Sequence, residues 1–219
     1  MARLLFEKTG NAVWMSHLDL MRLFQRAFKR AGLNLKHTQG FNPRPSVSIA
    51  LPLSVGVESI CELLDFELEG DLPSMEEIRE RLNKVLVTGV RVHSVSHSGR
   101  KLRDLALLDC KVTLEYEREV GEDAADAIRQ LFLSDQLFVA KKSKNGTVEQ
   151  DIIPMLHRIA VTYRDTHHID LDARICCQNP SMNPIQLVGA VSRYLPEYSP
   201  GYFTCRRIEI YDTDEKEFR

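Results

Sequence analysis

The sequence has no long apolar run and almost no net charge. Its longest uncharged apolar stretch falls well short of the roughly 18–20 residues that a membrane-spanning helix needs. Charge returns at Glu7, so the N-terminus lacks the apolar core of a secretory signal peptide. With 29 Lys and Arg against 31 Asp and Glu, a uniformly basic nucleic-acid-binding coat is excluded. We expect a cytoplasmic protein that makes no membrane contact.

Cysteine is sparse, and its spacing does not suit a metal centre. The five cysteines are Cys61, Cys110, Cys176, Cys177 and Cys205, with no CxxC pair and no CxxxCxxC motif. The chain therefore cannot itself hold a four-iron cluster, and such an odd, scattered set is typical of reduced thiols in a cytoplasm. A site made by His167, His168 and Cys176 would require a tertiary coincidence. The sequence predicts no metal and no cofactor bound by this chain.

The motifs of the common nucleotide-dependent and hydrolytic enzymes are also missing. There is no P-loop, no GxGxxG at the start of a helix, no GxSxG and no HExxH. The composition, 43% hydrophobic and 27% charged, excludes the disordered, collagen-like and low-complexity classes. A chain of 219 residues forms one large domain or two small ones.

The near-zero net charge conceals a basic N-terminal segment. Residues 1–50 contain eight basic and two acidic side chains, whereas residues 51–90 contain three basic and nine acidic ones. No Asp or Glu occurs between Asp19 and Glu58. A basic surface of this kind is the usual footprint of a polyanion partner. The alternative is that the acidic segment 58–80 folds beside the basic one and neutralises it.

Two helices in the first half have clear start signals. Ser16 with Asp19, and Ser74 with Glu77, have the three-residue spacing of a capping box. The first helix continues with apolar residues at helical spacing as far as a stop at Gly32.

The strands expected around these helices complete a βαββαβ order of elements. The expected strands are 3–8, with 12–15 as its continuation or as a small hairpin, then 46–53, 62–69 and 90–95. Alternation over 62–69 places Leu64, Phe66 and Leu68 inward and Asp65, Glu67 and Glu69 outward. The resulting βαββαβ order is that of the ferredoxin-like fold, an antiparallel sheet with both helices on one face.

The second half repeats this order of elements more loosely. Its expected strands are 111–116, 137–142, 157–163, 168–175 and 206–211, with helices at 123–132 and from Asn183-Pro184 to about residue 195. An inserted hairpin turns at Asn145-Gly146. The sequence therefore predicts an α+β fold of two ferredoxin-like domains in tandem, at 1–96 and 110–219, joined by a linker at 97–109.

The first helix carries the densest set of cations. Arg22, Arg26 and Arg30 follow one another at four-residue spacing on one helix face, with Lys29 beside them. Like charges at this spacing repel by about 0.2–0.5 kcal/mol per pair, so a helix built for stability alone would alternate them with Glu. We expect these cations to bind an anionic partner.

The following segment, 36–45, adds further cations, an aromatic ring and two prolines. Lys36 and Arg44 are placed to contact phosphates, and Phe41 to stack on a base or a planar cofactor. Gly40 permits a positive φ or a close backbone approach. The alternative for Phe41 is that it fills the core.

Two histidines are the candidate catalytic groups. His17 lies in the first turn of the helix, and His37 lies in the basic segment after it. Either would serve as a general base, with Arg44 or Lys36 stabilising a charged transition state. A local hydrogen-bonding role is the alternative for His17.

Four stretches carry a resemblance to a known family. They are FEKTG at 6–10, SHLDLMR at 16–22, QGFNPRP at 39–45 and LPLSVGVES at 51–59. They resemble the radical SAM-linked protein family, a bacterial domain family of unknown function that occurs fused behind a radical SAM enzyme or encoded next to one. The resemblance covers nearly the whole chain. It implies a radical SAM enzyme as partner, which would hold the iron–sulfur cluster and SAM, and it supplies no catalytic assignment.

Three functions fit these observations. The leading hypothesis is a non-catalytic accessory protein that binds structured RNA, such as tRNA or rRNA, for a radical SAM enzyme. In that role the anion-binding residues are Arg22, Arg26, Lys29, Arg30, Lys36 and Arg44, with Phe41 stacking on a base. The second is a metal-independent endoribonuclease. The third is a docking module whose basic surface binds an acidic face of the radical enzyme, without nucleic acid.

Overall fold

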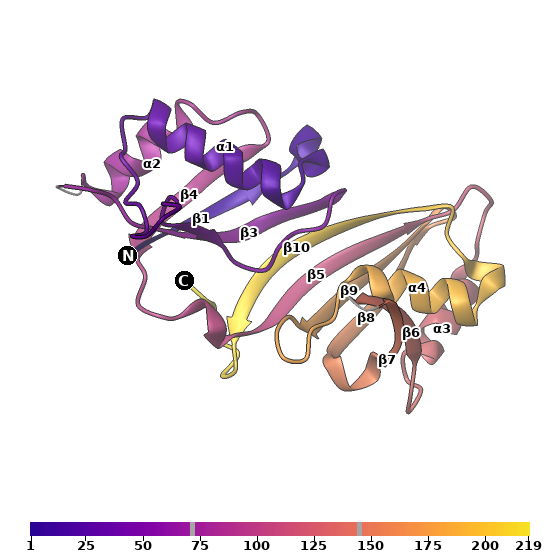
Figure 1. Ribbon diagram of the computed structural model, residues 1–219. Coiled ribbons are helices and arrows are strands. Elements are labelled where there is room, and N and C mark those ends of the chain that lie inside the picture. The colour runs from indigo at the N-terminus through magenta and orange to yellow at the C-terminus, as the bar shows by residue number, and fades with distance from the viewer. Residues whose placement is uncertain (71–72, 144–145) are drawn as a thin grey trace. The chain divides into compact units, whose positions relative to one another are not determined.

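The computed structural model describes residues 1–70, 73–143 and 146–219. Within these residues the chain has an α+β fold with four α-helices and antiparallel sheets. It divides into two compact units (Figure 1). Unit 1 comprises Met1–Asp104 and Glu217–Arg219, and unit 2 comprises Leu105–Lys216. The expected α+β class and antiparallel pairing are confirmed.

Unit 1 has the element order that the sequence pattern predicts. Its elements are β1 (Ala2–Lys8), the 3₁₀ helix η1 (Gly10–Trp14), α1 (His17–Arg30), β2 (Val47–Ile49), β3 (Val57–Phe66), α2 (Met75–Asn83) and β4 (Val90–His97). The strands lie in the order β4-β1-β3-β2, and each neighbouring pair is antiparallel. Phe24 of α1 and Ile78 of α2 share one core with Leu4 and Phe6 of β1. Both helices therefore cover the same face of this sheet (Figure 1).

The helix starts in unit 1 lie where the capping residues place them. The Ser16 hydroxyl accepts a hydrogen bond from the Asp19 amide at 3.2 Å, and that of Ser74 accepts one from the Glu77 amide at 3.1 Å. Each bond satisfies an amide that has no partner inside its helix. α1 ends before Gly32, which has a φ of +68°.

Residues 12–15 do not extend the first strand, contrary to expectation. Gly10 has a φ of +54°, and the chain turns there into η1, where the Ala12 amide donates to the Thr9 carbonyl at 3.1 Å. The second strand is also shorter than expected, because Leu51 has a φ of +46° and Pro52 lacks an amide hydrogen. Local turn geometry overrides apolar alternation at both places.

The third strand, β3, begins five residues before the expected 62–69. The prediction that Asp65 faces solvent is wrong. Asp65 is 7% exposed and forms an ion pair with Arg3. Phe218, from the C-terminal residues of unit 1, is fully buried, and its ring lies 5.0 Å from the Arg3 guanidinium carbon. Residues far apart in sequence thus cover the face on which alternation alone predicts solvent.

Unit 2 repeats the order of elements and contains a further hairpin. Unit 1 ends its first segment with η2 (Leu102–Asp104). The elements of unit 2 are β5 (Leu105–Glu115), α3 (Glu122–Leu131), β6 (Phe138–Ser143), β7 (Gly146–Asp151), η3 (Ile153–Met155), β8 (Leu156–Asp165), β9 (His168–Cys176), α4 (Ile185–Tyr194), η4 (Pro196–Tyr198) and β10 (Tyr202–Asp212). Four strands form an antiparallel sheet in the order β10-β5-β9-β8, and β6 pairs with β7. Strand β5 includes residues 105–109, where a linker was expected. Asn145 of the expected hairpin turn lies outside the described residues.

Candidate nucleic-acid interface

The amphipathic character of α1 exposes its cations. Leu20, Phe24, Ala27 and Phe28 form the buried stripe of the helix. The cations on the other side, here called the basic ridge, are all exposed: Arg22, Arg26, Lys29 and Arg30. The packing of the apolar stripe therefore fixes which way the basic ridge faces.

Most of this ridge has no carboxylate partner. Arg22 lies 3.3 Å from Asp19 across exposed side chains, a geometry that is worth little in water. Among the residues that the structure describes, Arg26, Lys29 and Arg30 form no ion pair.

The acidic segment 58–80 folds beside part of the basic segment, where Asp65 pairs with Arg3 and Glu67 pairs with Lys36. None of its described carboxylates forms an ion pair with an α1 cation. On α2, Glu76 pairs with Arg79 and Glu77 pairs with Arg81. The acidic segment therefore pairs with Arg3 and Lys36, whereas the cations of α1 form no ion pair with it in the described residues.

The segment after α1 forms a loop that is closed at its base. The Thr38 amide donates to the Arg44 carbonyl at 2.8 Å, and the Arg44 amide donates to the Thr38 hydroxyl at 3.0 Å. Two residues further from the tip of the loop, the Ser46 amide donates to the Lys36 carbonyl at 2.6 Å. Residues 39–43 therefore project as a short tip from a hydrogen-bonded stem.

Phe41 lies at this tip and takes no part in the core. Its side chain is fully exposed, at 113% of the reference value, so the core-filling alternative is wrong. The preceding Gly40 has a φ of +133°, a conformation that other residues rarely adopt. Arg44 is exposed at the stem and has no ion pair among the described residues. An exposed aromatic ring and an unpaired guanidinium thus share one loop.

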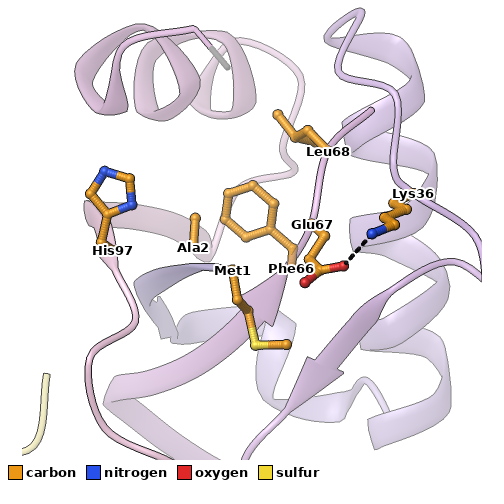
Figure 2. A pocket seen from close by; sticks show the side chains of 7 residues that line it. All are labelled: Met1, Ala2, Lys36, Phe66, Glu67, Leu68 and His97. Atoms are coloured by element: carbon orange, nitrogen blue, oxygen red, sulfur yellow. Dashed lines mark ion pairs between the residues drawn. The ribbon is translucent and has the colours of Figure 1, made fainter. Parts of the chain in front are cut away.

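Lys36 differs from the other cations of the predicted set, because its charge is partly neutralised. Its ammonium group lies 3.5 Å from the Glu67 carboxylate. Figure 2 shows this pair at the edge of a cavity of about 200 Å³, which Met1, Phe66 and His97 also line. Lys36 is therefore the weakest phosphate-binding candidate of the set.

A second, larger cavity lies beside α1. It has a volume of about 350 Å³ and is lined by Gln25, Lys29, Leu33, Asn34, Leu35, His37, Pro45 and Glu69. The sequence analysis did not identify Asn34 or Glu69 as site residues. Glu69 reaches the cavity because Leu35 and Leu68 form an antiparallel bridge and the Glu69 amide donates to the Asn34 carbonyl at 2.8 Å. No local motif signals that contact.

The structure does not bring the two candidate catalytic histidines together. His17 begins the 14-residue helix α1, whereas His37 lines a cavity with Gln25 and Lys29, two to three turns further along that helix. Nδ1 of His17 is buried without a hydrogen-bond partner within the described part of the chain. His37 is exposed and lines the larger cavity together with Lys29. Of the two, only His37 is open to a ligand at that cavity.

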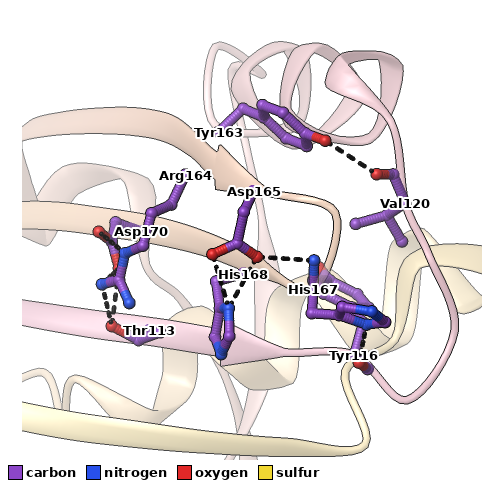
Figure 3. A network of polar contacts seen from close by, with 9 residues as sticks. All are labelled: Thr113, Tyr116, Val120, Tyr163, Arg164, Asp165, His167, His168 and Asp170. Carbon is purple, nitrogen blue, oxygen red and sulfur yellow. Dashed lines mark hydrogen bonds and ion pairs between the residues drawn. The ribbon is translucent and has the colours of Figure 1, made fainter.

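In unit 2, two histidines make hydrogen bonds within the fold. Nδ1 of His168 lies 2.8 Å from Asp165, and Nδ1 of His167 lies 3.0 Å from the Tyr116 carbonyl (Figure 3). The Asp165 carboxylate also accepts a hydrogen bond from the His167 amide at 2.8 Å, and this bond, with that from His168, lowers the pKa of Asp165.

Cys176, the third residue of the metal site considered from the sequence, lies far from His168. Cys176 ends β9, which begins at His168, so the length of the strand, about 26 Å, separates the two. Its sulfur lies 3.4 Å from Nε2 of His157, and burial raises the pKa of the Cys176 thiol. In the described ranges, no group of three or more His, Cys, Asp and Glu side chains is arranged to hold a metal ion. No helix in those ranges is long and apolar enough to cross a membrane.

Comparisons with known proteins identify a family for most of the chain. Residues 2–184 match the family described as "Uncharacterized protein conserved in bacteria (DUF2344)". No curated protein matches. A crystal structure of an unknown protein from Galdieria sulphuraria is similar at 12% identity and a TM-score of 0.28, over 94% of this chain and 96% of that one. The expected bacterial family without an assigned activity is confirmed, while the link to a radical SAM enzyme stays a prediction. The chain belongs to the DUF2344 family of conserved bacterial proteins.

Proposed function

We propose that this protein binds structured RNA, such as tRNA or rRNA, through α1 and the loop at 36–45, and that it does so as a non-catalytic accessory of a radical SAM enzyme. One observation carries the RNA part of the proposal. Arg26, Lys29, Arg30 and Arg44 are exposed without ion pairs in the described structure, in the same unit as the fully exposed ring of Phe41.

The two kinds of side chain suit the two parts of a nucleotide. Guanidinium and ammonium groups bind phosphate oxygens and release condensed counterions, which supplies affinity without sequence preference. An exposed aromatic ring on a closed loop offers a stacking surface, worth about 1–3 kcal/mol per unstacked base. A ridge with the same number of cations but no aromatic residue would suit an acidic protein equally well, so Phe41 favours nucleic acid.

We also infer that both units are ferredoxin-like domains. The support is their shared order of elements and the sheet orders β4-β1-β3-β2 and β10-β5-β9-β8, which place corresponding strands in corresponding positions. In unit 1 this arrangement leaves the outer face of α1 open, because the sheet covers only the inner one.

The radical SAM partner rests on the sequence resemblance. In this arrangement the partner holds the iron–sulfur cluster and SAM, and the present chain holds the RNA. The partner would be identified by co-purification from cells, with and without nuclease treatment.

The decisive experiment measures the fluorescence anisotropy of labelled tRNA against salt concentration. Contacts from Arg22, Arg26, Lys29, Arg30 and Arg44 predict a log–log slope of roughly −3.5 to −4.5. Equal affinity at low and moderate salt would refute the proposal. Absence of RNA binding, together with a protein complex that survives nuclease, would instead favour the docking module.

A nuclease remains the second candidate, because His37 and Lys29 line the same cavity. The imidazole would act as the general base and the ammonium group would stabilise the developing charge. Cleavage of RNA in EDTA that is lost in His37→Ala would support this activity, and no cleavage across a range of RNAs would exclude it.

A further inference from the structure

The cavity beside α1 combines an apolar floor with a polar rim. Leu33 and Leu35, which form its floor with Pro45, are 2% and 7% exposed. The volume of about 350 Å³ lies at the lower end of the range of about 300–1,000 Å³ that is typical of small-molecule sites. A cavity lined by both apolar side chains and hydrogen-bonding groups suits a planar, polar-edged ligand.

Two opposite charges line this cavity without pairing. Lys29 and Glu69 are both exposed, and neither forms an ion pair in the part of the chain that the structure describes. The smaller cavity differs, because there Lys36 and Glu67 lie 3.5 Å apart and partly cancel each other (Figure 2). The larger cavity is therefore suited to a ligand that bears both negative charge and N–H donors.

The carboxylate of Glu69 limits what such a ligand can be. A phosphate alone would be repelled by it, although Lys29 and the nearby ridge attract phosphate. An uncharged hydrocarbon would leave both charges without partners. A nucleotide satisfies both, because its phosphate meets the cation and its base presents N–H groups to the carboxylate.

Building on the proposed RNA-binding function, we propose that this cavity holds one unstacked guanine of the bound RNA. Glu69 accepts hydrogen bonds from the N1–H and N2–H groups of the base, and Lys29 binds the phosphate. The backbone bond between Glu69 and Asn34 keeps these two residues at one rim, so the side-chain amide of Asn34 or Gln25 can donate to O6.

The other bases fit this arrangement less well. Only guanine presents two adjacent N–H donors on its Watson–Crick edge. Adenine and cytosine place a ring-nitrogen acceptor beside their amino group, which would face the carboxylate lone pairs. Uracil has one N–H between two carbonyl acceptors. Bidentate recognition of an RNA base in a splayed-out conformation is a common source of sequence preference.

The test uses four labelled RNA hexamers, UUGUUU, UUAUUU, UUCUUU and UUUUUU, and measures their dissociation constants by anisotropy at one salt concentration. The hexamer with guanine is expected to bind about fivefold or more tightly than the other three. In Glu69→Gln this preference falls to below twofold, because an amide cannot accept from both donors. Affinity for UUUUUU stays the same or rises slightly as a negative charge is removed.

Glu67→Gln is the matched control, since it removes one carboxylate from the neighbouring cavity only. It is expected to keep the guanine preference. Glu69 is exposed at the surface, so its replacement leaves the thermal unfolding midpoint unchanged, and this midpoint is measured for both variants.

The outcomes separate this inference from the proposed function. Steep salt dependence with tRNA but equal affinity for the four hexamers overturns the guanine site alone, as does a preference that persists in Glu69→Gln. Absence of binding to tRNA and hexamers overturns both. If 5′-GMP binds as tightly as UUGUUU, the site takes free nucleotide, and the assignment to an RNA base is wrong.

Discussion

Arg3 and Asp65 form a bidentate ion pair inside unit 1. Nε of Arg3 lies 2.7 Å from Oδ1 of Asp65 and Nη2 lies 2.9 Å from Oδ2. Two of the three remaining guanidinium hydrogens are donated to the carbonyls of Arg100 at 2.8 Å and Arg219 at 3.2 Å. The Arg3 side chain is 1% exposed, and the planar fork of Arg satisfies each of these acceptors at once. The pair therefore connects β1 and β3 with the last residues of the chain.

Replacing Arg3 is expected to destabilise unit 1 strongly. Arg3→Ala leaves the Asp65 carboxylate buried without its partner, which costs about 3–5 kcal/mol in the free energy of unfolding. Urea denaturation at neutral pH measures this loss. Arg79→Ala removes an exposed ion pair on α2 and should cost at most about 1 kcal/mol. Similar losses in the two variants would show that Arg3 does not have this role.

Phe218 is expected to matter as much as a core residue, although it lies next to the C-terminal residue. It is fully buried, and the guanidinium carbons of Arg3 and Arg100 lie 5.0 and 4.5 Å from its ring centre. Phe218→Ala should cost about 3–5 kcal/mol, measured by urea denaturation. Phe218→Leu retains most of the apolar volume and should cost clearly less. A neutral Phe218→Ala would mean that the C-terminal residues are not bound in solution as described.

The buried carboxylate of Asp170 gives unit 2 a predictable pH dependence. Burial alone would raise its pKa, but hydrogen bonds from Arg164 and Thr113 (Figure 3) and from Lys111 outweigh burial and hold the pKa below the usual 3.8. The unfolded chain therefore binds a proton at a higher pH than the folded one. The stabilisation is present above about pH 4 and is lost as the pH falls through the lowered folded value.

The variant Asp170→Asn tests whether the folded-state pKa of Asp170 is lowered. It should reduce the free energy of unfolding by about 1.5–3 kcal/mol at pH 7, because the hydrogen bonds from three side chains lose their charged acceptor. The difference between wild type and variant should shrink when urea denaturation is repeated at pH 3. A difference that grows towards acid would mean that the folded pKa of Asp170 is raised.

The cations of the basic ridge should determine how steeply the affinity for tRNA falls with salt concentration. The double variant Arg26→Ala, Arg30→Ala should bind tRNA more weakly and reduce the magnitude of the log–log slope by about 2, or about 1 for each lost phosphate contact. The matched control is Arg79→Ala, Arg81→Ala, which removes two cations that already pair with Glu76 and Glu77. Equal effects of the two double variants would show that net charge alone determines binding.

Phe41 should affect RNA affinity without affecting stability. Because its ring is fully exposed, Phe41→Ala is expected to shift the free energy of unfolding by less than about 0.5 kcal/mol. The same change should weaken RNA binding by about 1–3 kcal/mol through loss of stacking. Phe41→Tyr retains the aromatic face and should bind nearly as well as wild type. Unchanged affinity in Phe41→Ala would remove the ring from the proposed interface.

The local features of this protein can be predicted from its sequence. The hydroxyls of Ser16 and Ser74 mark helix starts because a cap is a contact over three residues, and the spacing of Arg22, Arg26 and Arg30 places them on one face because the helical repeat is fixed. Alternation likewise indicates strands, but it does not say which face is covered or where a turn such as that at Leu51 ends pairing.

The contacts between distant segments cannot be predicted in this way, because they arise from the tertiary fold. It buried Asp65 against Arg3, placed Phe218 over the same sheet face, and brought Glu69 into one cavity with Lys29. Each of these depends on which strand pairs with which and in what register, and no single stretch of sequence encodes that. The cations were therefore identifiable from the sequence, whereas the carboxylate that would give them a base preference was not.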